Sequence, residues 1–513
     1  NNFLSRYAFK LALENKDYDY IKDELSPIAI ETQYDIKELD AVIISAISKK
    51  NNQKINDVDN ETDTDLDNAK RLLKLSNNTI ISINKNFHIY EDGYWKRDTS
   101  NTPNKYASKV NQVIKNELLE KDNTDYLIPH FKKSKMINHQ NNMVTQLHSL
   151  VPVSHEDVDT EETYQLINFT NGILDVTNGQ LNPHDPKYLI TMQVPYEYNP
   201  NAQCPEWHKF LDRITRTSKI KQDLQTLAGQ IIISETFENF IVFRGNGANG
   251  KTIFTQILQA MMGDYSAQVE TEVVSGNANK SQSKFAQHFL KDKRLIITSE
   301  TDKGCELSGS FVKQITSHSL FTSEEKHKPK TQWYPTCHMI LETNHDPIIK
   351  EQTDAINRRV KIFPFEDRIP DEEQIDPDEL LNKLKAELPG IFNWAYIGYK
   401  LNKKLGGFKK ALTNHITDAT KLFMEEQNPI HNFLTECTIK NRSADPIKLT
   451  TLYKKYKLYV LEEEEYEISR NAFSKILQEM NYKKGRNNQG VIFYGLELNH
   501  ESKYIKPRDI MYE

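Results

Sequence analysis

Hydrophobic and polar positions follow different periods along the chain, and each period predicts a different element. Apolar residues recur at helical spacing in FLSRYAFKLAL and LDAVIISAI, which predicts helices within residues 3–50. The stretch ISINKNFHIYEDGYWK alternates and turns at Glu91–Gly93, which predicts a hairpin. Between 165 and 195, short apolar runs are separated by Asn-Gly pairs at 171–172 and 178–179, which predicts strands joined by tight turns.

Further along, several short and almost wholly apolar runs predict buried strands. These runs are NFIVF at 239–243, RLIITSE at 294–300, HMILETN at 338–344 and VKIFPF at 360–365. A helical pattern precedes the first run, from Pro205 to Ser234, and another follows it, from Thr252 to Met262. The combination of buried strands and helices predicts a multi-domain α/β fold.

Shifts of composition divide the chain into regions. The stretch from Asn51 to Asn68 is rich in acidic residues and almost free of apolar ones, so burial cannot offset its ordering entropy and we expect a linker. The predicted regions are a helical segment over 1–50, an acidic linker over 51–68, a mixed α/β domain over 69–204, a helical stretch over 205–235, a nucleotide-binding core over 236–370, a helical segment over 371–428 and a small C-terminal domain over 429–513.

Composition narrows the class of protein. The net charge is −6, so contact with nucleic acid is expected from local basic clusters instead of from the whole surface. No apolar run approaches the ~18 residues of a membrane span and no signal peptide is visible, so we expect no membrane partner. The four cysteines lie far apart without a CxxC pair, which argues against zinc and suits a reducing cytoplasm. Abundant Asn, Lys and Ile favour a low-GC bacterial genome or its mobile elements, and hence a bacterial host cytoplasm.

The most informative motif is GNGANGKT at 245–252, which fits the phosphate-binding pattern G-x-x-x-x-G-K-[ST]. It stands between a predicted strand and a predicted helix, which is the context such a loop requires. Its glycines let backbone N–H groups turn inward, and the helix N-terminus adds partial positive charge. We expect Lys251 to reach the β- and γ-phosphates of ATP and Thr252 to bind Mg²⁺. The expected nucleotide-binding residues are Gly245, Asn246, Gly247, Ala248, Asn249, Gly250, Lys251 and Thr252.

The later strands supply candidate catalytic residues at their ends. Glu300 ends RLIITSE and is a candidate carboxylate for Mg²⁺ and the attacking water, or else a surface acid on a core strand. Asn344 ends HMILETN; its amide could orient the water and sense the γ-phosphate, or could only form a turn. Arg358 and Arg359 precede VKIFPF. An arginine supplied in trans by a neighbouring subunit would stabilise transition-state charge, although arginine pairs are also common on solvated surfaces.

A basic segment lies between the second and third strands. EEKHKPK at 324–330 contains Lys326, His327 and Lys328, followed by the turn-forming Pro329. Such residues suit a hairpin tip that contacts the phosphates of single-stranded DNA. The alternative is a solvated loop, which is the commoner role of charged runs.

These elements, taken in order, resemble superfamily 3 helicases, which are hexameric AAA+ motors, and most closely the primase–helicase family of poxviruses, phages and phage-inducible bacterial islands. The resemblance covers residues 165–370 well and implies that Lys251 and Thr252 form the Walker A pair. It further implies that Glu300 is the Walker B acid, Asn344 the sensor, Arg358 or Arg359 the arginine finger, and residues 326–328 a pore hairpin on DNA. It also makes residues 205–235 a helical collar.

Two departures from the family pattern stand out. The general Walker B motif ends in two acids, whereas Ser299 precedes Glu300 here. Glu300 would then serve both Mg²⁺ and the water, or Asp302 would assist. Adjacent Arg358 and Arg359 cannot both be fingers, because neighbouring residues in an extended segment point in opposite directions.

The two ends of the chain carry further resemblances. Residues 429–513 resemble a winged-helix domain, with a candidate recognition helix that opens at Ser469 and a wing tipped by Lys483, Lys484 and Arg486. Binding of duplex DNA is expected there, and docking of a protein is the alternative. The first 50 residues resemble the segment that joins a primase to its helicase, so a primase, fused upstream or separate, is an expected partner.

Together, these features predict an ATP-driven, hexameric DNA helicase with 3′→5′ travel that initiates replication of a phage or phage-related element. The alternative is an origin-binding AAA+ initiator that melts duplex DNA and uses nucleotide only as an assembly switch. A third class, a kinase with a phosphate-binding loop, is disfavoured by the basic segment and the arginine pair.

Overall fold

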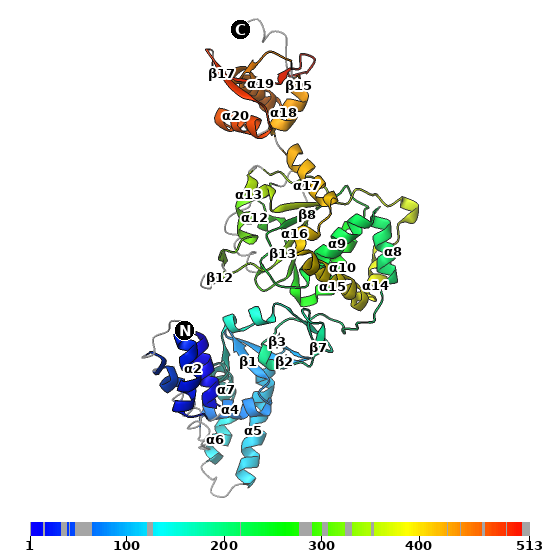
Figure 1. Ribbon diagram of the computed structural model, residues 1–513. Coiled ribbons are helices and arrows are strands. Elements are labelled where there is room, and N and C mark those ends of the chain that lie inside the picture. The colour runs from blue at the N-terminus through cyan, green and yellow to red at the C-terminus, as the bar shows by residue number, and fades with distance from the viewer. Residues whose placement is uncertain are drawn as a thin grey trace. The chain divides into compact units, whose positions relative to one another are not determined.

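The computed structural model divides into two compact units, Asn1–Ile80 with Thr99–Pro152, and Ile81–Asp98 with Val153–Glu513 (Figure 1). The structure describes residues 2–13, 16–31, 38–40, 42–46, 64–120, 127–215, 217–275, 290–299, 306–323, 331–349, 353–427, 429–441, 443–463, 467–488 and 490–504. No helix among these residues is long and apolar enough to cross a membrane.

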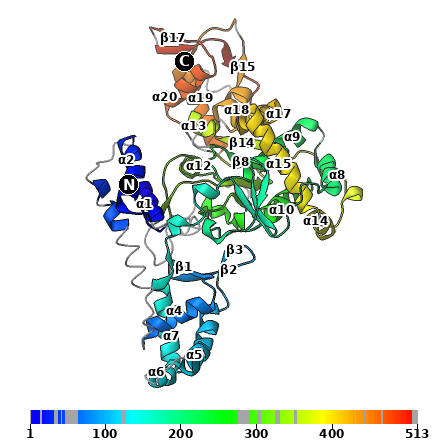
Figure 2. The same ribbon diagram turned by 60° about the horizontal axis from the view of Figure 1, so that its bottom comes forward.

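The first unit begins with helices, as the apolar spacing predicts. Helices α1 (Asn2–Leu13) and α2 (Tyr18–Glu31) pack against each other (Figure 2). Their apolar faces share a small core with residues of the next helical stretch, including Leu39 and Ile43. A helical segment at this end of the chain is therefore confirmed.

A second group of helices in this unit forms a bundle. Helix α4 (Asp65–Leu75) lies against α5 (Thr102–Glu120) and α7 (Ile137–Leu150), and α6 (Leu127–Ser134) packs on α5. Apolar residues at helical spacing, such as Leu72, are fully buried between them. The bundle therefore has the amphipathic construction expected of packed helices.

The predicted linker over 51–68 is wrong at its C-terminal end. Helix α4 starts at Asp65, and the Thr64 side chain accepts a hydrogen bond from the Asp67 N–H at 3.2 Å. Acidic side chains stabilise the first turn of a helix, because its N-terminus carries partial positive charge. Asp67 and Asn68 are buried among polar partners, which a count of apolar residues does not detect. Residues 51–63 lie outside the described residues.

The second unit is built around a five-stranded sheet with the order β14-β8-β13-β10-β9. All its described neighbours run parallel, so the carboxyl ends of the strands share one edge. The strands are β8 (Phe240–Arg244), β9 (Ser266–Val269), β10 (Leu295–Ser299), β13 (His338–Thr343) and β14 (Val360–Pro364). The four apolar runs are thus confirmed as strands, and β9 was not predicted.

Helices cover both faces of this sheet. On one face, α8 (Pro205–Ile214), α9 (Ser218–Ile231), α10 (Lys251–Met262) and α15 (Leu388–Leu405) share one hydrophobic core with the strands. The other face packs against α12 (Gly309–Ile315). The helices predicted over 205–235 are confirmed, and they belong to the core of the sheet. The remaining helices of this region are α13 (Asp354–Asn357), α14 (Pro377–Lys385), α16 (Phe408–Ala411) and α17 (Asn414–Glu426), the last of which lies along β14.

The structure does not show 69–204 as one domain, because most of its strand residues belong to the second unit and its helices α4 to α7 to the first. The predicted hairpin forms from β2 (Asn86–Glu91) and β3 (Tyr94–Arg97), and the Trp95 N–H donates to the Ile190 carbonyl at 2.9 Å. Long-range contacts of this kind leave no signal in local composition. The other strands are β1 (Ile80–Ile83), β4 (Pro152–Val153), β5 (Leu166–Phe169), β6 (Gly172–Asp175) and β7 (Gln180–Asn182), with the Asn-Gly pairs at the turns of β5–β6 and β6–β7.

The C-terminal residues have a hydrophobic core of their own. The helices and the hairpin predicted there are present, and the Ser469 side chain accepts a hydrogen bond from the Ala472 N–H at 3.3 Å at the start of the last helix. The elements are α18 (Pro429–Cys437), β15 (Thr438–Lys440), β16 (Ile447–Lys448), α19 (Leu449–Glu462), α20 (Arg470–Glu479), β17 (Lys484–Asn487), β18 (Gly490–Phe493) and β19 (Leu496–Leu498).

Candidate nucleotide-binding site

The glycine-rich loop connects β8 to α10 at the carboxyl edge of the sheet, and two of its glycines are closely packed. Gly250 has φ +81°, and a Cβ there would lie 2.4 Å from the Ile214 side chain. A Cβ on Gly245 would lie 2.2 Å from the Phe365 carbonyl oxygen. The Asn249 side chain donates to that same carbonyl at 2.8 Å and holds the loop against the chain after β14. Packing therefore disfavours a side chain at positions 245 and 250, whereas Gly247 has open space and is favoured by its φ of +89°.

The loop presents backbone donors at the start of a helix. In the described part of the chain, no carbonyl or side chain accepts a hydrogen bond from the N–H groups of residues 246–250. Because α10 begins at Lys251, its N-terminus adds partial positive charge at the same place. Free N–H groups beside a helix N-terminus suit the phosphate groups of a nucleotide.

The predicted sensor lies directly beside the loop lysine. Lys251 Nζ donates to the Gly245 carbonyl at 2.5 Å and to Asn344 Oδ1 at 2.9 Å. Arg244 and Thr343 are paired in register on β8 and β13, so the two residues that follow them, Gly245 and Asn344, meet at one edge. Burial lowers the pKa of Lys251 from its ordinary value, and the carboxylate of Glu342 opposes that shift. The sheet therefore brings two of the predicted residues together.

Glu342 is a residue of this site that the sequence reasoning missed. Its carboxylate accepts hydrogen bonds from the hydroxyl of Thr252 and, at 3.0 Å, from the hydroxyl of Thr255. Ile340 and Glu342 have the same parity on β13, and Ile340 is in the core that contains α10. This alternation was the available signal, since a buried acid two residues after a core residue faces the same helix. Lys251, Thr252, Glu342 and Asn344 are called the loop cluster below.

The predicted Walker B acid, Glu300, lies outside the described residues, as does Asp302. Strand β10 is described as far as Ser299, whose Cα is the register partner of Glu342 on β13. The acid observed beside Thr252 therefore comes from β13, the strand that precedes the predicted sensor Asn344 and is called the sensor strand below.

The two predicted arginines differ in exposure. Arg358 is exposed, whereas Arg359 is 9% exposed and donates from Nη1 to the Ala355 carbonyl at 2.8 Å. The Arg359 carbonyl accepts a hydrogen bond from the N–H of Phe240, the first residue of β8. The glycine-rich loop follows the other end of β8, a strand length of ~15 Å away. Neither arginine therefore belongs to the loop of its own chain.

Lys326, His327 and Lys328 also lie outside the described residues. The strands on either side of them are described and pair antiparallel: β11 (Phe321–Ser323) and β12 (Thr331–Trp333). The segment 324–330 thus connects two paired strands, as a hairpin tip does.

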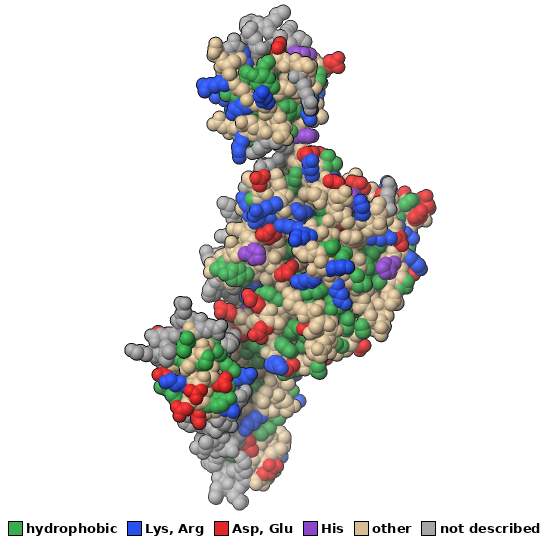
Figure 3. Space-filling model, viewed as in Figure 1, with side chains coloured by type: hydrophobic (Ala, Val, Ile, Leu, Met, Phe, Trp, Pro, Cys, Tyr) green, Lys and Arg blue, Asp and Glu red, His purple; other side chains and the backbone are tan. Residues whose placement is uncertain are grey.

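Basic side chains of the C-terminal residues line a groove. Lys483, Lys484 and Arg486 are exposed, and the last two face the groove between β17 and α20. Helix α20 contributes Arg470 and Lys475 to the same groove. Figure 3 shows Lys and Arg side chains on the side of this body where Figure 1 draws β17 and α20. The positive charge suits both the phosphate groups of DNA and the acidic side chains of a protein.

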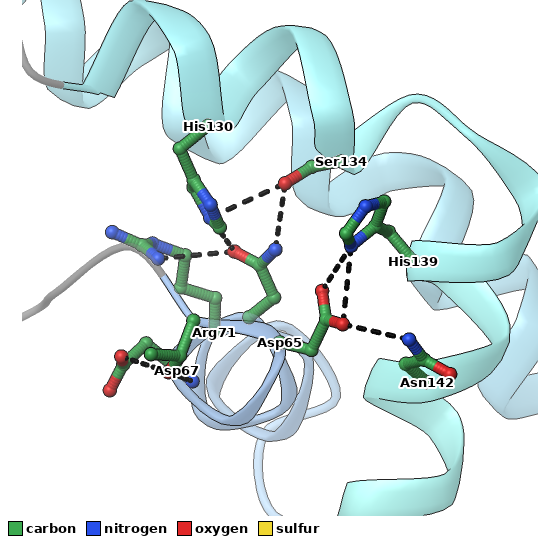
Figure 4. Close-up of polar contacts among 9 residues, drawn as sticks. Asp65, Asp67, Arg71, His130, Ser134, His139 and Asn142 are labelled. Carbon is green, nitrogen blue, oxygen red and sulfur yellow. Dashed lines mark hydrogen bonds and ion pairs between the residues drawn. The ribbon is translucent and has the colours of Figure 1, made fainter.

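A second buried polar cluster lies in the helical bundle (Figure 4). The Asn68 side chain accepts from Arg71 at 3.1 Å, lies 2.9 Å from His130 Nε2 and donates to Ser134 at 2.8 Å. Arg71 also forms an ion pair with Glu117 at 2.7 Å. These five residues are called the bundle cluster below. Nearby, Asp65 contacts His139 and Asn142 of α7. Among the described residues, no group of three or more His, Cys, Asp or Glu side chains could hold a metal ion.

Two family models match parts of the chain. Residues 69–216 match the model described as D5 N terminal like, and residues 243–359 match a family of unknown function. The first range includes most of the bundle, from the second turn of α4 onward, and the second includes the glycine-rich loop, Asn344 and both arginines.

Curated relatives come from viruses with large DNA genomes. The chain is 27% identical over 259 residues to a candidate helicase of Acanthamoeba polyphaga mimivirus, covering 49% of this chain and 26% of that protein. It is 21% identical over 369 residues to a candidate helicase of Invertebrate iridescent virus 6, covering 64% and 38%. It is 22% identical over 290 residues to a candidate primase of African swine fever virus, covering 52% and 30%. The chain therefore spans well under half the length of these relatives.

A comparison with solved structures finds the apo structure of the NrS-1 C-terminal region among its matches. That likeness has a TM-score of 0.45 and 11% sequence identity, and covers 83% of this chain and 98% of the other. The sequence matches support a likeness to D5-like primase–helicases.

Proposed function

We propose that the protein is an ATP-dependent DNA helicase of the AAA+ superfamily 3 type, which acts as a hexamer with 3′→5′ travel in the replication of a phage or phage-related element. The observation that carries the proposal is the loop cluster. It joins a lysine, a hydroxyl, a carboxylate and an amide at the carboxyl edge of a parallel sheet, beside N–H groups that have no acceptor among the described residues. The names of the viral relatives support a role in DNA replication.

The residues present fit ATP and Mg²⁺. The N–H groups of 246–250 and Lys251 would hold the phosphates, while Thr252 and a carboxylate would hold the ion. Bound Mg²⁺ supplies charge neutralisation on the β- and γ-phosphates. Asn344 would orient the attacking water next to Lys251, and Glu300 would accept its proton.

The position of Arg358 supports a ring. Because this exposed side chain lies at the sheet edge opposite its own loop, it can act on a nucleotide only from a neighbouring subunit. An arginine in trans requires a repeated head-to-tail interface, and closure of that interface gives a ring. A homo-hexamer is the ring that we propose.

Two basic regions would contact DNA. The segment with Lys326, His327 and Lys328 would bind single strands inside the ring, and the groove between α20 and β17 would bind duplex DNA as a winged helix does. A primase, fused upstream or separate, would supply primers. The site of action would be the cytoplasm of a bacterial host.

The test is DNA-stimulated ATP hydrolysis together with unwinding of forked substrates of increasing duplex length. We expect the double variant Lys326→Ala/Lys328→Ala to keep basal hydrolysis and to lose roughly 10-fold or more of the stimulation, because charged contacts to phosphates are removed. The matched control is Lys132→Ala/Lys133→Ala, two exposed lysines on α6, which should behave as wild type. Stimulation that survives in the first variant would contradict the hairpin role.

The second candidate function is an initiator that melts DNA locally, and the basic groove of the C-terminal residues favours it. Such a protein would open short duplexes only, whatever the ATP concentration. Unwinding that continues as the duplex is lengthened would exclude it, and unwinding that stops within one turn of the helix would establish it.

A further inference from the structure

We propose that Glu342, on β13 and two residues before the sensor Asn344, is the carboxylate that orients Thr252 and holds Mg²⁺. Glu300 is then left to act on the attacking water. This inference rests on the proposed function and concerns the division of labour within its site. It assigns a role to a residue that lies within the resemblance but was given no role by it.

The geometry around the carboxylate is that of an ion-binding group. One Glu342 oxygen accepts from the hydroxyl of Thr252, the residue expected to bind the ion through its oxygen. A hydroxyl that binds a cation through its lone pair still needs an acceptor for its proton, and Glu342 provides one. The other oxygen accepts from Thr255 at 3.0 Å, which fixes the carboxylate in place.

The burial of Glu342 supports the same assignment. Glu342 is 8% exposed. It lies on β13, which is flanked in the sheet by β8 and β10. A buried carboxylate is stable only with a compensating positive charge or several donors. The two hydroxyls supply donors, and Lys251 and the ion would supply charge.

The register of the sheet explains the missing acid of the Walker B strand. Ser299 occupies the position where a second acid is expected, and its Cα is paired with that of Glu342. Leu295, Ile297 and Ile340 are all in the core that contains α10, so by alternation Ser299 and Glu342 face that helix together. Glu342 therefore places a carboxylate on the strand next to the expected one, on the same face of the sheet.

The test measures ion binding apart from catalysis. Mn²⁺ affinity is followed by electron paramagnetic resonance with the full chain and a non-hydrolysable ATP analogue, and nucleotide affinity is followed separately in EDTA. We expect Glu342→Gln to weaken Mn²⁺ binding by ~10–100-fold, since glutamine keeps the shape but removes the charge and leaves one acceptor oxygen where the carboxylate has two. Nucleotide affinity in EDTA should stay at the wild-type value.

Adding an acid at the paired position should restore the site. We expect Ser299→Asp in the Glu342→Gln background to recover Mn²⁺ affinity, whereas Ser299→Asn in that background should not. If Glu342→Gln does not fold, Glu342→Asp serves instead, and the shorter side chain should weaken Mn²⁺ binding while the charge is kept.

Wild-type Mn²⁺ affinity in the glutamine variant would overturn the proposal, as would an equal loss of nucleotide affinity in EDTA, which would indicate a purely structural role. Failure of the proposed function is distinguishable, because it would appear as absent DNA-stimulated hydrolysis and absent unwinding in the wild-type chain, whatever its Mn²⁺ affinity.

Discussion

The bundle cluster and the loop cluster are built from similar side chains but differ in what they leave open. In the bundle, Asn68 bonds to three neighbours and Arg71 is paired with Glu117, so the polar groups satisfy one another. At the loop, Lys251 bonds to Asn344 and to the Gly245 carbonyl, and the N–H groups of residues 246–250 have no acceptor in the described part of the chain. A closed polar cluster specifies packing, whereas an open one at a helix N-terminus is suited to a ligand.

Exposure separates the clusters in the same way. Asn68 and Arg71 are buried, while Thr252 and Asn344 at the loop remain exposed although Lys251 beside them is buried. A ligand can therefore reach the loop cluster without unfolding anything. Changes at the loop should alter binding and catalysis, and changes in the bundle should alter stability alone.

The largest effect is expected from Lys251→Ala, which should reduce ATP hydrolysis by at least ~10³-fold. The variant removes the only cation seen in the loop cluster, whose charge should be most effective in a site sheltered from water. Hydrolysis is measured by phosphate release, and thermal denaturation should show an intact fold. Hydrolysis of ATP at the wild-type rate would contradict the assignment of the nucleotide site.

The next largest effect is expected from Arg358→Ala, with a loss of ~10³-fold in kcat at unchanged nucleotide affinity, because an arginine in trans acts mainly on the transition state. Arg359→Ala is the matched comparison. Its side chain is buried and bonded to the Ala355 carbonyl, so this variant should lower the melting temperature instead. Mixing Arg358→Ala with Lys251→Ala subunits should restore some hydrolysis at mixed interfaces. If Arg359→Ala instead left the melting temperature unchanged and abolished hydrolysis, Arg359 would be the arginine finger.

The bundle side of the comparison is tested by Arg71→Ala. Removing one partner of a buried ion pair should cost ~3 kcal/mol, because Glu117 would keep an uncompensated charge in a partly buried place. Native-state hydrogen exchange of α4 amides measures this local loss without assuming that the whole chain unfolds together. Nucleotide affinity should not change.

A control replaces both partners. Arg71→Met/Glu117→Leu should cost less than Arg71→Ala alone, since no unpaired charge is left behind. If Arg71→Ala instead weakened nucleotide binding with no change in exchange, the bundle cluster would be part of a functional site and the contrast with the loop would fail.

Sequence reasoning succeeded at the loop because its evidence is local. GNGANGKT defines its own strand, turn and helix, and Asn344 ends an apolar run that is visible by itself. Glu342 was missed because its partner Thr252 is 90 residues away and only the parallel register brings them together. The same reason explains Arg359, whose burial follows from pairing with the start of β8.

The domain boundaries were harder to predict for a related reason. Residues 81–98 and 153–204 pack with the second unit through bonds such as that of Trp95 to the Ile190 carbonyl. The acidic stretch before α4 suggested a linker, yet Asp65 and Asp67 stabilise the helix that follows. Composition reports the average tendency of a segment, whereas these outcomes depend on individual partners far away in the chain.

The smallest expected effect concerns a buried histidine in each region. His130 belongs to the closed bundle cluster and contacts both Asn68 and Ser134. His338, the first residue of the sensor strand, is fully buried and bonds through Nδ1 to the Arg294 carbonyl at 2.8 Å, while its Nε2 has no partner among the described residues. Burial lowers the pKa of His338 to about 4. The sensor strand should therefore be the more sensitive to acid.

The direction in which stability changes with pH follows from proton uptake. Between pH 6.5 and 4 the unfolded chain takes up a proton at His338 and the folded chain does not, so stability is lost as pH falls, by about 1 kcal/mol over the first pH unit. Asp159 acts in the opposite direction below about pH 6, because burial raises its pKa to about 6. The effect of His338 should thus be clearest between pH 6.5 and 6.

His338→Asn keeps a donor near the Nδ1 position and cannot be protonated. Between pH 6.5 and 6, the free energy of unfolding of the second unit, measured with denaturant, should therefore depend less steeply on pH in this variant than in wild type. An equal slope in both proteins would mean that His338 is hydrated, and that the sensor strand is less tightly closed from solvent than the bundle.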